Sequence, residues 1–389
     1  MHNPAWGDAL ALARAILLVL CATTTLFYLY ALVAARDIVG RLRRAADGGA
    51  AQPPVSILKP LRGLDNDAVA NFVSFCEQDY GAFEILFGAE DEEEPGLAAA
   101  REAVRAHPNV DVRYFVESGA SGANPKVRTV GNLARHAKYP LLLVSDSDIS
   151  VGPDHLRRMV APLRDPSVGV VTCLYRTRAR GLVGRIDALS LSTEFLPGAL
   201  VARRLEGMSF AMGAGILIRR DALEDIGGFE ALQDCLADDY LLGKLPYEAG
   251  HRVELARDVV DHRLGTRSFS DLGDRQNRWN MGIRTSRPWG YAGLVFTQGT
   301  AAALLYLAAS GGSAFGWTVA AVTLAVRLGS ASFLALTCLR DATILRDLWL
   351  VPLRDLLATA LWVRSFFGDT VVWRGRRLRV GAGGRILAS

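Results

Sequence analysis

The sequence has few cysteines, and none of them has the spacing of a metal-binding pair. Five cysteines are scattered over 389 residues without a C-x-x-C pair. An odd number of widely separated thiols is typical neither of a disulfide framework nor of a structural zinc site. Stability must therefore come from buried apolar side chains, and the chain is long enough for one large core or two smaller ones.

The sequence also lacks a strong charge imbalance, internal repeats and low-complexity segments. Its net charge is only +4, and no compact stripe of Lys and Arg with interleaved aromatic residues accompanies it. This excludes nucleic acid as the expected partner. Half of the residues are hydrophobic and the mean hydropathy is positive, which instead directs attention to membrane segments.

An uncharged apolar segment near the N-terminus predicts a transmembrane helix within residues 1–36. Residues 15–35 are long enough to cross a hydrocarbon core of about 30 Å. The segment is longer than the apolar region of a typical signal peptide and no A-x-A cleavage site follows it, which favours a spanning helix. By the positive-inside rule, the arginines that follow place the next domain on the cytoplasmic side. These residues are Arg36, Arg41, Arg43 and Arg44.

The C-terminal residues 288–389 predict a second membrane region with a basic tail. Residues 288–326 carry no charge and are interrupted by Ser310-Gly311-Gly312, a pattern that predicts two closely spaced helices. A further apolar segment, residues 348–367, contains charges that are costly at the centre of a bilayer, so we expect it to be re-entrant, interfacial or a third span. Its charged residues are Arg354, Asp355 and Arg364.

Between these ends, residues 53–287 alternate short apolar strands with helix-like segments. This alternation predicts an α/β domain with a mostly parallel sheet and helices on both faces. In such sheets, ligands bind beyond the carboxyl ends of the strands, so polar residues at those ends are candidates for chemistry. The predicted strands include "PVSILKP", "EILFGAED", "VDVRYFV", "PLLLVSDSD" and "VGVVTCLY".

Acidic residues end two of these strands. "LFGAEDEEE" supplies Asp91, and "LVSDSD" supplies Asp146 and Asp148, one residue apart. Paired carboxylates can share Mg²⁺ or Mn²⁺, a coordination that a substrate diphosphate completes. The alternatives are that Asp148 helps to cap the helix expected from Pro153 and that the acidic run is a solvated loop.

Two later segments add further candidates. "LADDY" contains Asp238 and Asp239, and a carboxylate that faces a cleft can take a proton from an attacking hydroxyl. "RQNRW" contains Arg275, Arg278 and Trp279; arginine suits phosphate oxygens and tryptophan suits a sugar face. The alternative for Arg278 and Trp279 is an anchor at the membrane surface.

The order of these pieces resembles a glycosyltransferase with the GT-A (Rossmann-like) fold, and in detail family 21, the ceramide glucosyltransferase family, with its bacterial hopanoid-biosynthesis branch. The resemblance covers roughly Pro53 to Tyr291, with weaker echoes in "PLRDLL" and "WRGRRLRV". A lone DxD pattern is weak, whereas the ordered set is specific. The matching segments are "KPLRGLD", "FCEQDYGAFEILFGAED", "NPKV", "SDSDI", "LADDY" and "RQNRW".

The resemblance implies a role for each candidate residue. Asp239 corresponds to the general base, and Asp146 and Asp148 to the DxD site that holds Mg²⁺ or Mn²⁺. Animal members can have glycine in place of Asp148, so the resemblance supports a metal role more firmly for Asp146. The residues implied in nucleotide-sugar binding are Asp91, Lys126, Arg275, Arg278 and Trp279.

The implied reaction is an inverting transfer of glucose or N-acetylglucosamine from a UDP-sugar to a lipid hydroxyl. The acceptor is ceramide or a hopanoid polyol, and details such as "FCEQDYGAF" and "SRPWGY" favour the hopanoid branch. The expected location is the bacterial inner membrane, as a multi-pass protein whose catalytic domain, residues 53–287, is cytoplasmic. Three alternatives remain: a polyprenyl-phosphate sugar transferase, a processive polysaccharide synthase, or a membrane protein that binds nucleotide sugar without catalysis.

Overall fold

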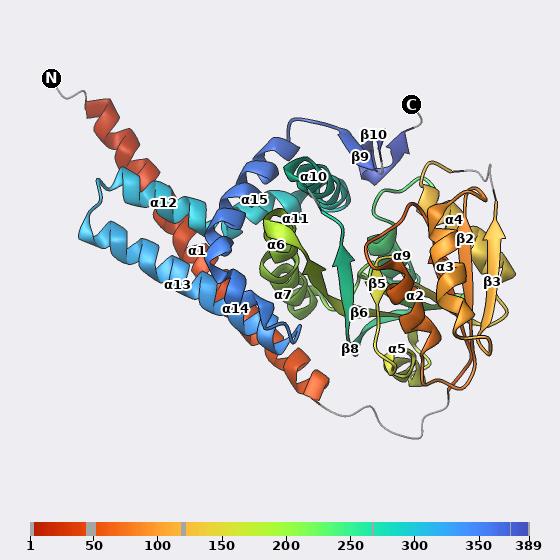
Figure 1. Cartoon of the computed structure of the whole chain (residues 1–389). Coiled ribbons are helices and arrows are strands. Elements are labelled where there is room, and N and C mark those ends of the chain that lie inside the picture. Colours follow the sequence, from red (N-terminus) through yellow and green to blue (C-terminus); the bar gives the residue numbers. More distant parts are fainter. Residues whose placement is uncertain (1–3, 44–51, 118–121, 267, 374, 388–389) are drawn as a thin grey trace. The chain divides into compact units, whose positions relative to one another are not determined.

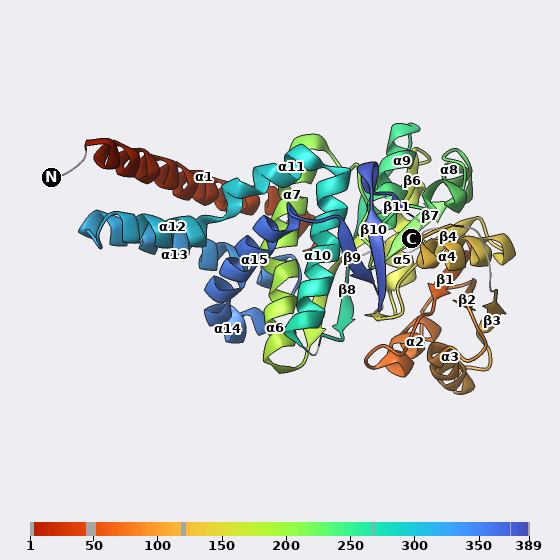
Figure 2. The same cartoon turned by 90° about the horizontal axis from the view of Figure 1, so that it is seen from above.

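The computed structural model describes residues 4–43, 52–117, 122–266, 268–373 and 375–387; Arg44, named above, and Arg374 lie outside these ranges. Figures 1 and 2 show the structure from two directions. The chain forms two compact units, and both are discontinuous in sequence. The sheet unit consists of Arg41–Arg180, Arg203–Thr266 and Leu378–Ser389; the helical unit consists of Met1–Gly40, Gly181–Ala202 and Arg267–Arg377.

The division into units cuts across the expected catalytic domain. Residues 181–202 and 267–287 fall within the predicted range 53–287, but they pack with the helical unit. The domain limits drawn from the sequence, which mark the expected catalytic domain, remain a prediction. By its packing, the α/β architecture belongs to the sheet unit alone.

The sheet unit contains an eight-stranded sheet of order β3-β2-β1-β4-β7-β6-β8-β5. β1 pairs in parallel with both β2 and β4, whereas β7 runs antiparallel to β4 and β6. The strands are β1 (Val55–Pro60), β2 (Phe83–Ala89), β3 (Asp111–Val116), β4 (Leu141–Val144), β5 (Ile149–Ser150), β6 (Val168–Ala179), β7 (Ile216–Arg219) and β8 (Arg252–Leu264).

The sheet is therefore mixed, not mostly parallel as the alternation of strands and helices suggested. The reversed strand β7 is formed by "ILIR", after the chain has left the sheet unit at Arg180 and returned at Arg203. Because this long excursion replaces a simple strand–helix–strand crossover, the strand that follows is not bound to the parallel direction.

Helices cover both faces of the sheet, as expected. Figure 2 shows α2 and α3 on one side of β1 and β2, with α4 on the other. Ile57 packs on the α2 and α3 side and its neighbour Leu58 packs on the α4 side, because successive side chains of a strand point in opposite directions. The helices of this unit are α2 (Ala68–Cys76), α3 (Pro95–Arg105), α4 (Pro125–His136), α5 (His155–Val160), α8 (Arg220–Glu224) and α9 (Asp238–Glu248).

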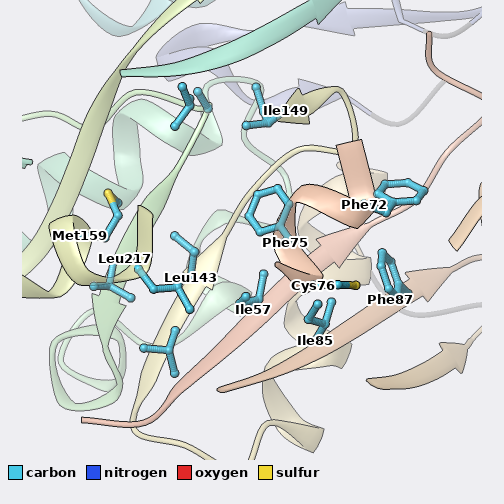
Figure 3. Packing of buried hydrophobic residues seen from close by; sticks show 14 of the residues in the cluster. Ile57, Phe72, Phe75, Cys76, Ile85, Phe87, Leu143, Ile149, Met159 and Leu217 are labelled. Carbon is cyan, nitrogen blue, oxygen red and sulfur yellow. The ribbon is translucent and has the colours of Figure 1, made fainter. Parts of the chain in front are cut away.

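The hydrophobic core between the sheet and helices α2 and α3 is rich in aromatic side chains. Figure 3 shows Phe72 and Phe75 of α2 beside Phe87 and Ile57 of the sheet. All four are almost completely buried, and each contributes about 1.5–3 kcal/mol relative to an exposed side chain. This packing fixes α2, and with it the loop between β1 and α2, against the carboxyl ends of the strands.

The C-terminal residues return to the sheet unit. β11 (Ile386–Leu387) pairs antiparallel with β10 (Arg376–Val380). The Ile386 amide donates to the Asp234 carbonyl at 2.6 Å, and the Leu236 amide donates to the Gly384 carbonyl at 2.9 Å. The end of the chain thus holds the segment that leads into α9 and its two acids.

Among its described residues, the helical unit contains two helices that are long and apolar enough to span a membrane, or three if a bent pair counts as one span. The two cover Trp6–Gly40 and Ala314–Thr337; the bent pair joins Pro288–Thr297 to Gly299–Ala309 at 49°. Figure 1 shows α12 and α13 side by side, with the residues 310–313 between them. The elements are α1 (Pro4–Arg43), α6 (Gly181–Ser190), a π-helix (Leu191–Phe195), α7 (Leu196–Glu206), α10 (Phe269–Ser286), α11 (Pro288–Gly293), α12 (Gly299–Ala309), α13 (Ala314–Thr337), α14 (Thr343–Asp347), α15 (Val351–Ser365) and β9 (Thr370–Trp373).

Two of the three charges of the 348–367 segment are buried inside the helical unit, whereas Arg364 is exposed. Arg354 of α15 is fully buried and donates to Glu194 of the π-helix at 2.6 and 2.8 Å. Asp355 accepts from Arg327 of α13 at 2.5 and 3.0 Å. Burying both partners of an ion pair together avoids the uncompensated charge that makes a single buried ion costly. Apolar side chains such as Leu353 face outward, whereas α15 turns Arg354 and Asp355 inward. That the segment is re-entrant, interfacial or spanning stays a prediction.

Candidate active site

A lysine bridges two acids in the sheet unit. Lys126 Nζ lies 2.8 Å from Asp146 Oδ1 and 3.2 Å from Asp238 Oδ2. Lys126 is in the first turn of α4, where the Asn124 side chain accepts from the Lys126 amide at 3.0 Å and caps the helix. Burial alone would lower the pKa of Lys126, but the carboxylates of Asp146, Asp238 and Asp239 outweigh burial and hold that pKa above its usual range. The ammonium therefore stays charged, as a binding group for phosphate would need to be.

Asp239, the second acid of "LADDY", lies in the first turn of α9 and is partly buried. Its Oδ1 accepts from the Tyr240 amide at 2.8 Å. Burial, followed by the neighbouring charge of Asp238, raises the pKa of Asp239 to about 6, against the opposing effect of Lys126. A carboxylate with this pKa is ionised at neutral pH and still basic enough to take a proton.

The raised pKa predicts an acid limb in the pH profile. Because a general base must be ionised, kcat/KM is expected to rise with pH through about 6 and to level off above it. Asp238→Asn removes the neighbouring negative charge, so the limb should move to lower pH, while Lys126 and Asp146 remain facing Asp239. Initial rates between pH 4.5 and 8.5 measure this, and an unchanged limb in the variant would show that Asp238 does not tune the base.

The position of the Asp239 carboxylate depends on a glycine. A Cβ on Gly213, in the segment before β7, would lie 2.9 Å from Asp239 Oδ2. Since this contact is with the movable end of a side chain, a methyl group there should displace the carboxylate more readily than the backbone.

We expect Gly213→Ala to lower kcat by roughly 10-fold or more, because a small misplacement of a catalytic group is costly to the rate. The melting temperature should change little. Gly152→Ala is the matched control, since a Cβ on Gly152 would meet no atom within 4 Å. Equal kcat values for the two variants would contradict the expected role of Gly213; kcat and thermal unfolding are the measurements.

The other two predicted acids have different partners. Asp148 Oδ2 lies 3.2 Å from His262 Nε2 of β8, and the Asp148 carbonyl accepts from the Arg263 amide at 2.8 Å. Asp91 is exposed after β2 and accepts from the Glu93 amide at 2.9 Å, which is a turn contact. The structure thus brings together Lys126 and Asp146, and holds Asp148 and Asp91 by other neighbours.

The remaining predicted residues lie on α10 in the helical unit. Arg275 forms an ion pair with buried Asp187 of α6, and its guanidinium lies 4.9 Å from the centre of the Trp279 ring. Arg278 lies 5.2 Å from the centre of the Trp373 ring on β9. The three residues of the "RQNRW" motif therefore each have a defined partner within their own unit.

The residues at the end of β4 fit a divalent cation by their chemistry. Asp146 and Asp148 offer carboxylate oxygens, the ligands that Mg²⁺ and Mn²⁺ prefer, and the Asp146 side chain is 37% exposed. Among the described residues, no three His, Cys, Asp or Glu side chains gather into a metal site. A cation held here would therefore need ligands from water or from a substrate diphosphate.

Sequence reasoning missed a buried lysine beneath this site. Lys59 Nζ, at the end of β1, donates to the Asp146 carbonyl at 2.7 Å and to Ser145 Oγ at 3.2 Å, and lies 3.6 Å from the Phe75 ring centre. Burial lowers the pKa of Lys59 to about 7 although the nearby acids oppose the shift. The signal was present as a lysine inside the apolar strand "VSILKP", which is expected to be buried only when its charge has partners.

Comparison with known proteins settles the family. The sequence profile described as Glycosyl transferase family 21 matches residues 16–386, nearly the whole chain. The chain belongs to glycosyltransferase family 21. It is 24% identical over 387 residues to ceramide glucosyltransferase 1 of Caenorhabditis elegans, which covers 95% of this chain and 80% of the relative. Ceramide glucosyltransferase 3 of the same organism is 26% identical over 260 residues, or 65% of this chain and 55% of that protein.

A solved structure supports the GT-A fold of this family 21 member. The mannosyltransferase PcManGT from Pyrobaculum calidifontis, in complex with GDP-Man and Mn²⁺, matches with a TM-score of 0.53 at 19% sequence identity. The match covers 91% of this chain and 99% of the other. The predicted α/β GT-A fold, the candidate membrane helices and the membership of family 21 are thus confirmed, and the chain is a ceramide glucosyltransferase-like glycosyltransferase.

Proposed function

We propose that this protein transfers glucose or N-acetylglucosamine from a UDP-sugar to the hydroxyl of a membrane lipid, with inversion at the anomeric carbon. The observation that carries the proposal is the cluster in the sheet unit, where Lys126 joins Asp146 to the acid beside Asp239. Together with the membership of family 21, this contact supports Lys126 as a group that binds the donor phosphate and Asp239 as the base.

The proposed reaction assigns one step to each group. Asp239 takes the proton from the acceptor hydroxyl, the oxygen attacks C1 of the sugar, and the bond from C1 to the diphosphate breaks to release UDP. Lys126 stabilises the negative charge that grows on the diphosphate. Asp91, Arg275, Arg278 and Trp279 are proposed to bind the nucleotide sugar, as the resemblance to the family implies.

Asp146 and Asp148 are proposed to hold Mg²⁺ or Mn²⁺ against the donor diphosphate. When bound, the cation supplies charge stabilisation for the leaving group, worth several kcal/mol. Asp146 Oδ1 lies 2.8 Å from the Lys126 ammonium. To bind the metal ion, the Asp146 carboxylate would have to leave Lys126 or contact both Lys126 and the ion.

The acceptor is proposed to be a lipid alcohol, either ceramide or a hopanoid polyol. The candidate spans in the helical unit support a membrane-bound enzyme, and transfer of a lipid out of a bilayer costs about 0.8 kcal/mol per CH₂ group. We propose a multi-pass protein of the bacterial inner membrane with its catalytic residues on the cytoplasmic side. The names of the relatives favour ceramide, whereas the sequence details "FCEQDYGAF" and "SRPWGY" favour the hopanoid.

The test is transfer from a radiolabelled donor. Membranes that contain the protein are incubated with UDP-glucose or UDP-N-acetylglucosamine, with Mg²⁺ or Mn²⁺, and with ceramide, bacteriohopanetetrol or a polyprenyl phosphate. A labelled ceramide or hopanoid supports the proposal and names the acceptor. Label only in the polyprenyl phosphate, or in none of the lipids with the protein intact in the membrane, would overturn it.

A further inference from the structure

The turn that carries the two candidate metal-binding acids is held by an earlier part of the chain. Residues 145–148 follow β4. The Asp146 and Asp148 side chains contact Lys126 of α4 and His262 of β8, and the groups that hold the turn from its other side include ones from β1, the loop after it and α2. Lys59 fixes the first half of the turn, through the Ser145 hydroxyl and the Asp146 carbonyl. The second half depends on Ser147, the residue between the two acids.

Ser147 is restrained through both its side chain and its backbone. Its hydroxyl donates to Asp65 Oδ2, and its carbonyl accepts from Asn71 Nδ2 at 3.3 Å. Asn71 of α2 is fully buried and also donates to the Asn66 carbonyl at 3.2 Å, so the side chain that holds Ser147 is itself tied to the loop before the helix. Ser147 is only 5% exposed.

This arrangement has a consequence for the acids on either side. A residue restrained at its hydroxyl and its carbonyl leaves little rotational freedom to the peptide groups that connect it to Asp146 and Asp148. Removing a group that orients a metal ligand without itself binding the metal typically weakens metal affinity by about 10- to 100-fold. A carboxylate that accepts from a hydroxyl of the turn is such a group, although it need not touch the ion.

We propose that Asp65 is a positioning residue of the cation site, acting through the Ser147 hydroxyl to hold Asp146 and Asp148 in their binding geometry. This inference rests on the metal role given to those acids in the proposed function. Asp65 is the last residue of the segment "KPLRGLD", and the resemblance to the family assigned no role to it.

The test is Mn²⁺ binding to the full-length protein in detergent or nanodiscs, measured by the loss of the free-ion signal in electron paramagnetic resonance, with and without UDP. Ser147→Ala and Asp65→Ala are each expected to weaken Mn²⁺ binding about 10-fold or more. The double variant should be no weaker than the weaker single variant, because each change breaks the same contact. Ser167→Ala is the matched control, since Ser167 Oγ donates to Asp165 at 2.7 Å on an exposed turn of the same unit.

Three outcomes would overturn the inference. If Ser147→Ala lowers the melting temperature but leaves Mn²⁺ affinity at the control value, the contact serves stability alone. If the two losses multiply in the double variant, Asp65 acts independently of Ser147. If the unaltered protein binds Mn²⁺ neither alone nor with UDP, the metal role in the proposed function is wrong as well. The first two outcomes, in contrast, overturn only the role of Asp65.

Discussion

Asp239→Asn is expected to lower kcat for sugar transfer by about 10²–10⁴-fold, the usual contribution of a positioned general base. Asparagine has nearly the same shape and can still accept from the Tyr240 amide, as Asp239 does at 2.8 Å. The first turn of α9 should therefore remain intact while the proton acceptor is lost. Steady-state rates with the labelled donor measure the effect.

UDP binding and a control variant distinguish the loss of the base from general damage to the binding site. Binding of UDP should be almost unchanged in Asp239→Asn, because the base is proposed to act on the acceptor. Asp225→Asn is a control for the chemical change itself, since Asp225 is an exposed residue whose carboxylate pairs with His251. A variant at Asp239 that retains more than about a tenth of the activity would remove Asp239 as the base and leave the proton to another group.

The sequence could predict the acids but not their partners. Asp146 and Asp239 stand in motifs that are recognisable from their order, and strands and helices around them follow from apolar periodicity. The contact between Lys126 and Asp238 joins residues more than a hundred positions apart, and no local pattern contains it. Long-range contacts of this kind are decided by the topology of the sheet, which here includes the reversed strand β7.

The division of the chain shows the same limit. Residues 181–202 lie within the predicted catalytic domain, yet they pack with the helical unit. Their assignment follows from buried charges, because Asp187 pairs with Arg275 and Glu194 pairs with Arg354. Each pair links segments at least 80 residues apart in the chain, so only the fold could identify them.

Asp146→Asn is expected to have the second large effect, with a different signature. It removes a carboxylate proposed to hold the divalent cation, and loss of several kcal/mol of charge stabilisation corresponds to roughly 10²–10³-fold in rate. Mn²⁺ affinity and Mn²⁺-dependent binding of UDP should fall together, whereas Asp239→Asn should leave both in place. Lys126 retains Asp238 as a partner at 3.2 Å, so the fold of the cluster should survive.

The matched control removes another ion pair between lysine and aspartate in the same unit. Lys138 Nζ lies 2.5 Å from Asp111 Oδ2 on the exposed side of β3, and Asp111→Asn should leave rate and Mn²⁺ affinity unchanged. If Asp146→Asn slows transfer but binds Mn²⁺ normally, Asp146 acts through Lys126 and not through a cation. Asp146→Asn, compared with Asp111→Asn, thus distinguishes a donor diphosphate bound by a metal ion from one neutralised by Lys126 alone. Only in the first case should removal of the Asp146 carboxylate abolish the dependence of transfer on Mn²⁺.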